Sequence, residues 1–177
     1  GTLSFAAGEV SKTITVNIQG DVRFEGDEGF TVTLSNATGG ASITTAAASG
    51  IIREDDIILG TAGNDSLRGT SFADSIRGLA GDDVLQGDEA NDTIEGNEGA
   101  DTLIGGTGAD SLIGGDGLDT ASYSNAAAAV ALSLVTGGTG GDALGDRFTG
   151  IENVLGSDFA DAITGDDLAN LLNGGAG

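Results

Sequence analysis

The feature that most constrains this chain is a nine-residue unit that repeats without a gap over residues 60–122. All seven units begin with glycine and carry aspartate at position six. Position eight is leucine or isoleucine in the first six units and Ala121 in the seventh. A fixed short period of this kind is typical of a solenoid, in which each unit buries its apolar side chain only against its neighbours.

The period predicts the geometry of the coil. We expect six residues of turn and three of strand in each unit, with position eight pointing inward. One unit takes the chain halfway round, so two units form one coil, and coils stack at the strand spacing of about 4.8 Å. Alternate units then share an edge. The first edge carries Asp65, Asp83, Asp101 and Asp119, and the second edge carries Asp74, Asp92 and Asp110.

Stacked carboxylates favour a bound cation. Neighbours about 5 Å apart repel by roughly 3 kcal/mol at an effective dielectric constant near 20, and a cation between them reverses the sign. An all-oxygen site suits Ca²⁺ better than Mg²⁺, which requires tighter octahedral geometry. The inter-aspartate gaps predict up to about five calcium ions, three on the first edge and two on the second. Side chains at position four, Phe72 and Ala90, should strain the second-edge turns and weaken binding there.

Composition excludes several functions. The chain has 28 acidic and 6 basic residues, so nucleic acid and anionic membranes are poor partners, and no apolar run is long enough to insert into a membrane. It has no histidine or cysteine, which removes the usual general base and the thiolate ligands. Since the repeat itself requires the carboxylates, we do not expect an enzyme. Calcium ions, other copies of the chain and neighbouring domains of the same chain remain as partners.

The repeat is interrupted at residues 123–155. Alternating apolar residues predict a strand at 130–134, although the alanine run at 126–129 leaves a short helix open. Residues 141–149 return to the original phase, and residues 156–173 add two more units. Position six in these units is held by Asp146, Asp161 and Asn170.

Residues 1–57 have a different pattern, with short β-rich runs separated by glycine-rich turns. The expected antiparallel strands are 2–5, 12–18, 30–35 and 49–53. Four strands are too few to close a sandwich, so we expect only part of one.

The nonapeptides resemble the repeats-in-toxin (RTX) family, whose Gly-Gly-x-Gly-x-Asp-x-U-x unit, with U a large aliphatic residue, forms a parallel β-roll that holds Ca²⁺ in its turns. The run GDRFTGIENVLGS at 145–157 looks like the linker that joins two such blocks. The resemblance implies a first block at 58–122, a linker and capping segment at 123–155, and the start of a second block at 156–177. It places Asp161 among the metal ligands, whereas Asn170 departs from the pattern.

The family resemblance also implies secretion. Its members commonly leave the cell by a one-step (type I) export route read from a C-terminal signal, which this chain does not contain. Their rolls fold only outside the cell, where calcium is millimolar. We therefore expect an extracellular location, at the cell surface or in the matrix.

Residues 1–57 resemble the C-terminal half of a Calx-beta domain. GDVRFEGDEGFTVTLSN is similar to the long acidic loop and following strand of that family, and GIIREDD to its closing strand. The missing strands would come from upstream sequence or another chain. In calcium-binding members the corresponding acids gather at one tip of the sandwich, which here implies Asp21, Glu25, Glu28, Asp55 and Asp56.

The expected fold is therefore all-β: a partial Calx-beta, immunoglobulin-like sandwich followed by a parallel RTX β-roll. The leading hypothesis is a calcium-binding structural or adhesive region of a large secreted bacterial surface or matrix protein. One alternative is the calcium-dependent accessory or secretion region of a secreted hydrolase or toxin. Another is a self-assembling subunit of a fibre or surface layer.

Overall fold

A computed structural model describes residues 2–15, 28–40, 42–52 and 57–177. In this part of the chain it contains sixteen strands and one short 3-10 helix, η1 (Gly141–Ala143), which confirms an all-β fold. None of the described segments forms a helix that is long and apolar enough to cross a membrane.

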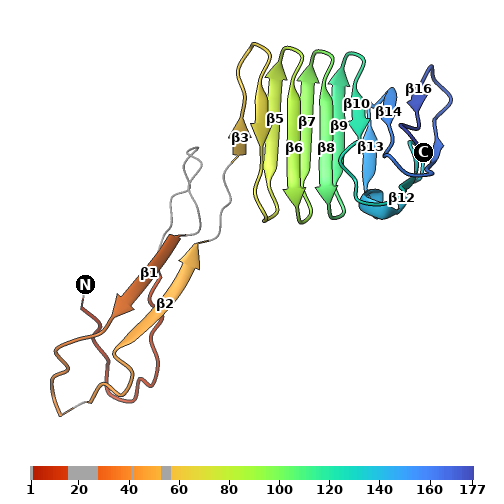
Figure 1. The fold of residues 1–177 in the computed structure, drawn as a ribbon. Helices are drawn as coiled ribbons and strands as arrows, with labels where there is room; N and C mark the ends of the chain where they lie inside the picture. The colour runs from red at the N-terminus through yellow and green to blue at the C-terminus, as the bar shows by residue number, and fades with distance from the viewer. Residues whose placement is uncertain (1, 16–27, 41, 53–56) are drawn as a thin grey trace.

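Residues 57–177 wind into a parallel solenoid whose strands form two main sheets (Figure 1). The six-stranded sheet contains, in spatial order, β16 (Leu171–Asn173), β14 (Asn153–Leu155), β10 (Thr120–Ser122), β8 (Thr102–Thr107), β6 (Val84–Glu89) and β4 (Ser66–Arg68). The five-stranded sheet contains β13 (Arg147–Thr149), β9 (Ser111–Asp116), β7 (Thr93–Glu98), β5 (Ser75–Ala80) and β3 (Ile57–Leu59).

Strand register confirms the coil of two units. Leu85 lies opposite Leu103, and Ile94 lies opposite Leu112, each pair 18 residues apart in parallel strands. The strands β5 to β9 are six residues long, so the expectation of three-residue strands is wrong. They continue into the next unit because the backbone of its second and third residues also pairs with the adjacent coil, as Leu79 does with Asn97.

The interior of the coil follows the strand period of two. Position eight is fully buried from unit two to unit seven, as predicted. The same alternation turns position six and the following position one inward, so each row of aliphatic side chains is flanked by aspartate and glycine. A Cβ on Gly78 would overlap the Asp83 carboxylate and the Gly96 carbonyl of the next coil. Position one is therefore glycine for lack of space.

The segment between the two repeat blocks adds a small third sheet. Its strand β11 (Ala131–Ser133) pairs in parallel with β15 (Ala162–Thr164) and antiparallel with β12 (Gly137–Gly140). The predicted strand at 130–134 is thus confirmed, and residues 126–129 form no helix. The predicted return to phase is also confirmed, because Phe148 lies opposite Leu112.

The N-terminal region contains one antiparallel pair, β1 (Glu28–Thr33) and β2 (Ala47–Ile52). The strands predicted at 30–35 and 49–53 are confirmed with a shift of about two residues. Residues 2–5 and 12–15 form no strand, so that expectation is wrong, and 16–18 lie outside the described residues. A strand needs a partner for its backbone groups, and none of the described residues provides one there. The described residues thus form a hairpin and not a sandwich.

Candidate metal centre

The position-six aspartates stack in two ladders, one along each edge of the solenoid. In each ladder the backbone N–H of one aspartate donates a hydrogen bond to Oδ1 of the aspartate one coil further on, at 2.8–2.9 Å. The donor and acceptor pairs are Asp65–Asp83, Asp83–Asp101 and Asp101–Asp119 on the first edge, and Asp74–Asp92 and Asp92–Asp110 on the second.

Both ladders extend beyond the seven regular units. The N–H of Asp110 donates to Oδ1 of Asp146 at 2.8 Å, and the N–H of Asp119 donates to Oε2 of Glu152 at 2.9 Å. Asp146 was predicted for position six. Glu152 was missed, because it lies 33 residues after Asp119 and no periodic signal in the sequence marks it.

The second oxygen of five carboxylates has no partner. The five residues are at most 2% exposed, and their Oδ2 atoms are inaccessible to solvent. Buried acceptors of this kind normally have a hydrogen-bond donor, but these atoms have none. Leaving a buried, charged acceptor unsatisfied costs at least about 1–3 kcal/mol, so each of these atoms favours a positive ligand. The five residues are Asp83, Asp92, Asp101, Asp110 and Asp119.

The electrostatics of these side chains point the same way. Burial, with smaller contributions from the charges of neighbouring carboxylates, raises the pKa of Asp92 and Asp119 to about 6 and that of Asp110 to about 7. The same causes raise the pKa of Asp101. Without a cation, the ladders hold their negative charge at a cost in free energy.

The loops that carry the orphaned oxygens share a backbone conformation, and we call them open loops. Their second residue is left-handed, with φ between 78° and 121°. In four of them a carbonyl oxygen from the adjacent coil approaches the carboxylate: a Cβ on Gly78, for example, would overlap both Asp83 Oδ2 and the Gly96 carbonyl. The left-handed residues are Leu79, Asp88, Asn97, Gly106 and Gly115.

Carboxylate and carbonyl oxygens at one place are the ligands that Ca²⁺ takes in proteins. The orphaned carboxylate atoms and the carbonyl oxygens near them therefore fit a calcium ion in the chemistry of the ligands. Among the described residues no three acidic side chains come close enough to hold a metal, so the carbonyls would have to complete the coordination.

Other loops satisfy their carboxylate internally, and we call them closed loops. Thr61 donates its N–H to Asp65 Oδ2 at 2.6 Å and its hydroxyl at 2.9 Å. Thr70 donates in the same way to Asp74 Oδ2, at 2.6 and 3.1 Å. Sequence reasoning missed this difference, although the residue type at position two signals it.

The first loop of the second block is also closed. Ser157 donates its N–H to Asp161 Oδ2 and its hydroxyl to Asp161 Oδ1, both at 2.7 Å, while Val130 N–H donates to Oδ1 at 2.8 Å. Burial opposes ionisation of Asp161, but these hydrogen bonds together lower its pKa.

The predicted strain at position four is present in one of the two loops. Ala90 adopts φ of +78°, a left-handed conformation that costs a residue with a Cβ energy. Phe72 lies in a closed loop and does not have positive φ. Whether the second edge binds calcium less well stays a prediction.

The proposed Calx-beta tip lies almost wholly outside the described residues. This applies to Asp21, Glu25, Asp55 and Asp56. Glu28 is the first residue of β1. The prediction of a second calcium site there remains open.

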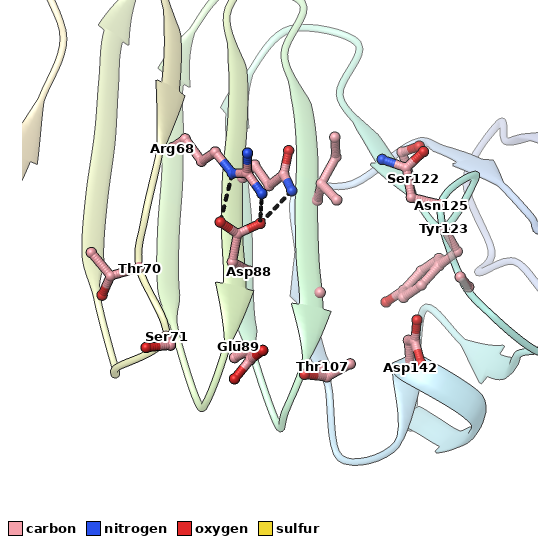
Figure 2. Close-up of a pocket in the computed structure, with 14 residues that line it drawn as sticks. Arg68, Thr70, Ser71, Asp88, Glu89, Thr107, Ser122, Tyr123, Asn125 and Asp142 are labelled. Atoms are coloured by element: carbon pink, nitrogen blue, oxygen red, sulfur yellow. Dashed lines mark hydrogen bonds and ion pairs between the residues drawn. The ribbon is translucent and has the colours of Figure 1, made fainter.

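A groove of about 440 Å³ runs along the second-edge loops on the outside of the six-stranded sheet. Figure 2 shows Arg68 reaching over to Asp88, whose carboxylate accepts hydrogen bonds from its Nε and Nη2 at 2.6 and 3.1 Å. Gln86 also donates to Asp88. Tyr123 and Asp142 lie at the far end of the groove from Ser71. Arg68 neutralises Asp88, which leaves Glu89 and Asp142 as the other acidic residues along the groove.

Comparison with known proteins agrees with this geometry. The sequence model of the RTX calcium-binding nonapeptide repeat matches four times, at residues 54–71, 59–94, 68–103 and 95–122. No curated protein matches the chain.

Proposed function

Because residues 54–122 belong to the RTX calcium-binding nonapeptide repeats, we propose that this chain is a calcium-dependent structural or adhesive segment of a large secreted bacterial surface or matrix protein, which folds when it binds Ca²⁺ after export. The observation that carries the proposal is the set of five buried aspartate oxygens without partners. A bound ion would give each of them the positive charge that the protein does not supply.

In this proposal both the position-six aspartates and the carbonyl oxygens of the turns are ligands of the ions. The ion supplies charge neutralisation, and the chain supplies the spacing of the oxygens and excludes water from them. The folded roll binds calcium and the unfolded chain does not, so calcium drives folding by mass action. A single site gains about 2.7 kcal/mol when free calcium is 100 times its Kd, and several sites multiply the effect.

We prefer a structural role to a catalytic one because of the way in which the buried carboxylates are arranged. Every buried carboxylate in the described part of the chain belongs to a ladder and is held by its backbone neighbour or by a side chain of the same loop. The positions of these carboxylates follow the period of the repeat, and they do not converge on a place where a substrate would bind. The two alternative functions, an accessory region of a secreted hydrolase and a self-assembling subunit, would use the same calcium sites. They differ from the leading proposal in the domains or the other copies of the chain to which the roll is attached.

Circular dichroism of residues 1–177 in calcium and in chelator tests the proposal. We expect β-structure with calcium at millimolar concentration, its loss on chelation, and little recovery with magnesium at the same concentration, since magnesium retains its waters. An equal β-signal in calcium and in chelator would contradict calcium-dependent folding. Equal recovery by both cations would instead indicate general charge screening.

A further inference from the structure

On the basis of the proposed calcium function, we infer that ions load only the five open loops, and that hydroxyl and amide donors of the protein replace calcium at the N-terminal end of both ladders, at the C-terminal end of the second-edge ladder, and in the first loop of the second block. The carboxylates excluded from binding are Asp65, Asp74, Asp146 and Asp161. The repeat pattern predicts Asp65, Asp74 and Asp161 as metal ligands, and this inference removes them from the set.

Tyr123 provides the replacement at the C-terminal end of the second-edge ladder. Its hydroxyl donates a hydrogen bond of 2.6 Å to Asp146 Oδ2, and its side chain is 3% exposed. Oδ1 of Asp146 already accepts the N–H of Asp110. Both oxygens of Asp146 are therefore occupied by protein donors, whereas the Oδ2 of Asp110, one coil earlier, has none.

Hydroxyl residues at position two provide the replacement at the N-terminal ends of the two ladders and in the first loop of the second block. Thr61, Thr70 and Ser157 each direct both an N–H and a hydroxyl to the carboxylate of their own loop. None of the three has the positive φ found at position two of the open loops. A cation would have to break two hydrogen bonds in such a loop and change its backbone.

The last described unit shows that a closed loop needs no carboxylate at position six, although its position-two Asp166 accepts a hydrogen bond from Asn170 Nδ2 at 3.1 Å. Position six is Asn170 there, and its Oδ1 accepts the N–H of Asp166, the second residue of that loop, at 2.8 Å. Asp166 also lacks positive φ. A neutral amide thus fills the role that Asp65 and Asp74 have in their loops. All five open loops, by contrast, carry aspartate.

The inference differs from a model in which each ion is shared by two aspartates 18 residues apart. The shared-ion model makes Asp65 and Asp74 ligands, together with Asp83 and Asp92. In the structure the Oδ2 atoms of the first pair are hydrogen-bonded and those of the second pair are not. The two models therefore predict different effects of removing one carboxylate.

Counting calcium ions in matched aspartate-to-asparagine variants of residues 1–177 tests the inference. Native mass spectrometry at saturating calcium would compare Asp92→Asn with Asp74→Asn, which are neighbours on one ladder, and Asp110→Asn with Asp146→Asn. We expect D92N and D110N to lose at least one ion each, and D74N and D146N to retain the wild-type number. Asn170 is the precedent for a folded loop with asparagine at this position.

Loss of an ion from D74N or D146N in a protein that is still folded by circular dichroism would overturn the inference. Retention of all ions by D92N and D110N would overturn it equally. If the wild-type chain binds no calcium, the proposed function itself fails, so the two failures are distinguishable. Should D146N not fold, the comparison of D92N with D74N decides alone.

Discussion

At the scale of single residues, backbone conformation at positions two and four determines what each loop can hold. Open loops place a left-handed residue at position two, and glycine, asparagine and aspartate tolerate this conformation best. Position four is left-handed as well in Gly81, Gly99, Gly108 and Gly117, and the adjacent coil lies directly above it. A Cβ on Gly99 would collide with the Gly81 carbonyl. The close stacking of the loops thus requires glycine at position one and favours it at position four, where two of the seven units carry Phe72 and Ala90 instead.

Ala90 offers a direct test, since it has a Cβ where its counterparts have none. We expect Ala90→Gly to stabilise the calcium-bound roll by about 1 kcal/mol, because glycine removes the left-handed strain. Thermal unfolding in calcium would show a raised midpoint. The reverse change, Gly99→Ala, should lower it by a larger amount because of the steric clash. Stabilisation by both changes, or by neither, would show that left-handed strain at position four does not affect the stability of the roll.

At the scale of the strands, one column of aliphatic side chains makes up the core of the first block. Leu85, Ile94, Leu103 and Leu112 are fully buried, and each contacts its counterparts on the coils before and after it. The column continues past the first block, since Ala121 lies opposite Val154 in the six-stranded sheet and Leu112 lies opposite Phe148 in the five-stranded sheet. Each coil therefore depends on its neighbours for burial, as expected of a solenoid.

Truncation within this column should be costly. We expect Leu103→Ala to destabilise the calcium-bound protein by about 2–5 kcal/mol, since it removes apolar contacts and leaves a cavity between two coils. Leu118 is 65% exposed, so Leu118→Ala is the matched control and should change the unfolding free energy by no more than about 0.5 kcal/mol. Denaturant unfolding in saturating calcium measures both. A similar cost for the two variants would show that the column is not the core.

At the scale of the whole molecule, stability is a balance between apolar burial and charge. The chain has a formal net charge of −22, and seven of its carboxylates are buried in the ladders. In the metal-free roll these groups repel one another, and only cations or protons can relieve the repulsion. Calcium would do so at neutral pH.

Protons should replace calcium in part on acidification. The folded-state pKa values of about 6 for Asp92 and Asp119 and about 7 for Asp110 lie above the ordinary value of 3.8 that applies to the unfolded chain. The folded state therefore binds more protons between pH 4 and 7, so these groups make the metal-free roll less stable as pH rises through that window. We expect more β-structure at pH 5 than at pH 8 in calcium-free buffer, measured by circular dichroism. An increase of β-structure with pH would contradict this assignment.

Competition between protons and calcium for the same oxygens also predicts how the calcium affinity changes with pH. Because protons occupy the free oxygens below pH 7, calcium binding measured by isothermal titration should weaken steadily from pH 7.5 to pH 5.5 and release protons as it proceeds. D74N should show the same pH dependence as the wild type, since Asp74 is not a ligand in the inferred scheme. An affinity that does not change with pH would mean that the orphaned oxygens do not bind the ion.

By itself, the sequence determined the coil. Glycine at position one, aspartate at position six and an aliphatic residue at position eight recur with one period, so the parallel roll, its two edges, the inward face and the pairing of residues 18 apart could all be predicted. Local periodicity suffices there because each unit contacts only its neighbours.

Only the tertiary structure decided which carboxylates remain without partners. Tyr123 is 23 residues from Asp146 and Glu152 is 33 residues from Asp119, and neither separation follows the period. The insertion brings them to the ends of the ladders by folding back on the roll. Burial and hydrogen bonding are properties of the assembled coil, so identical aspartates in the repeat acquire different surroundings: some are satisfied by protein donors, and five are left for a cation.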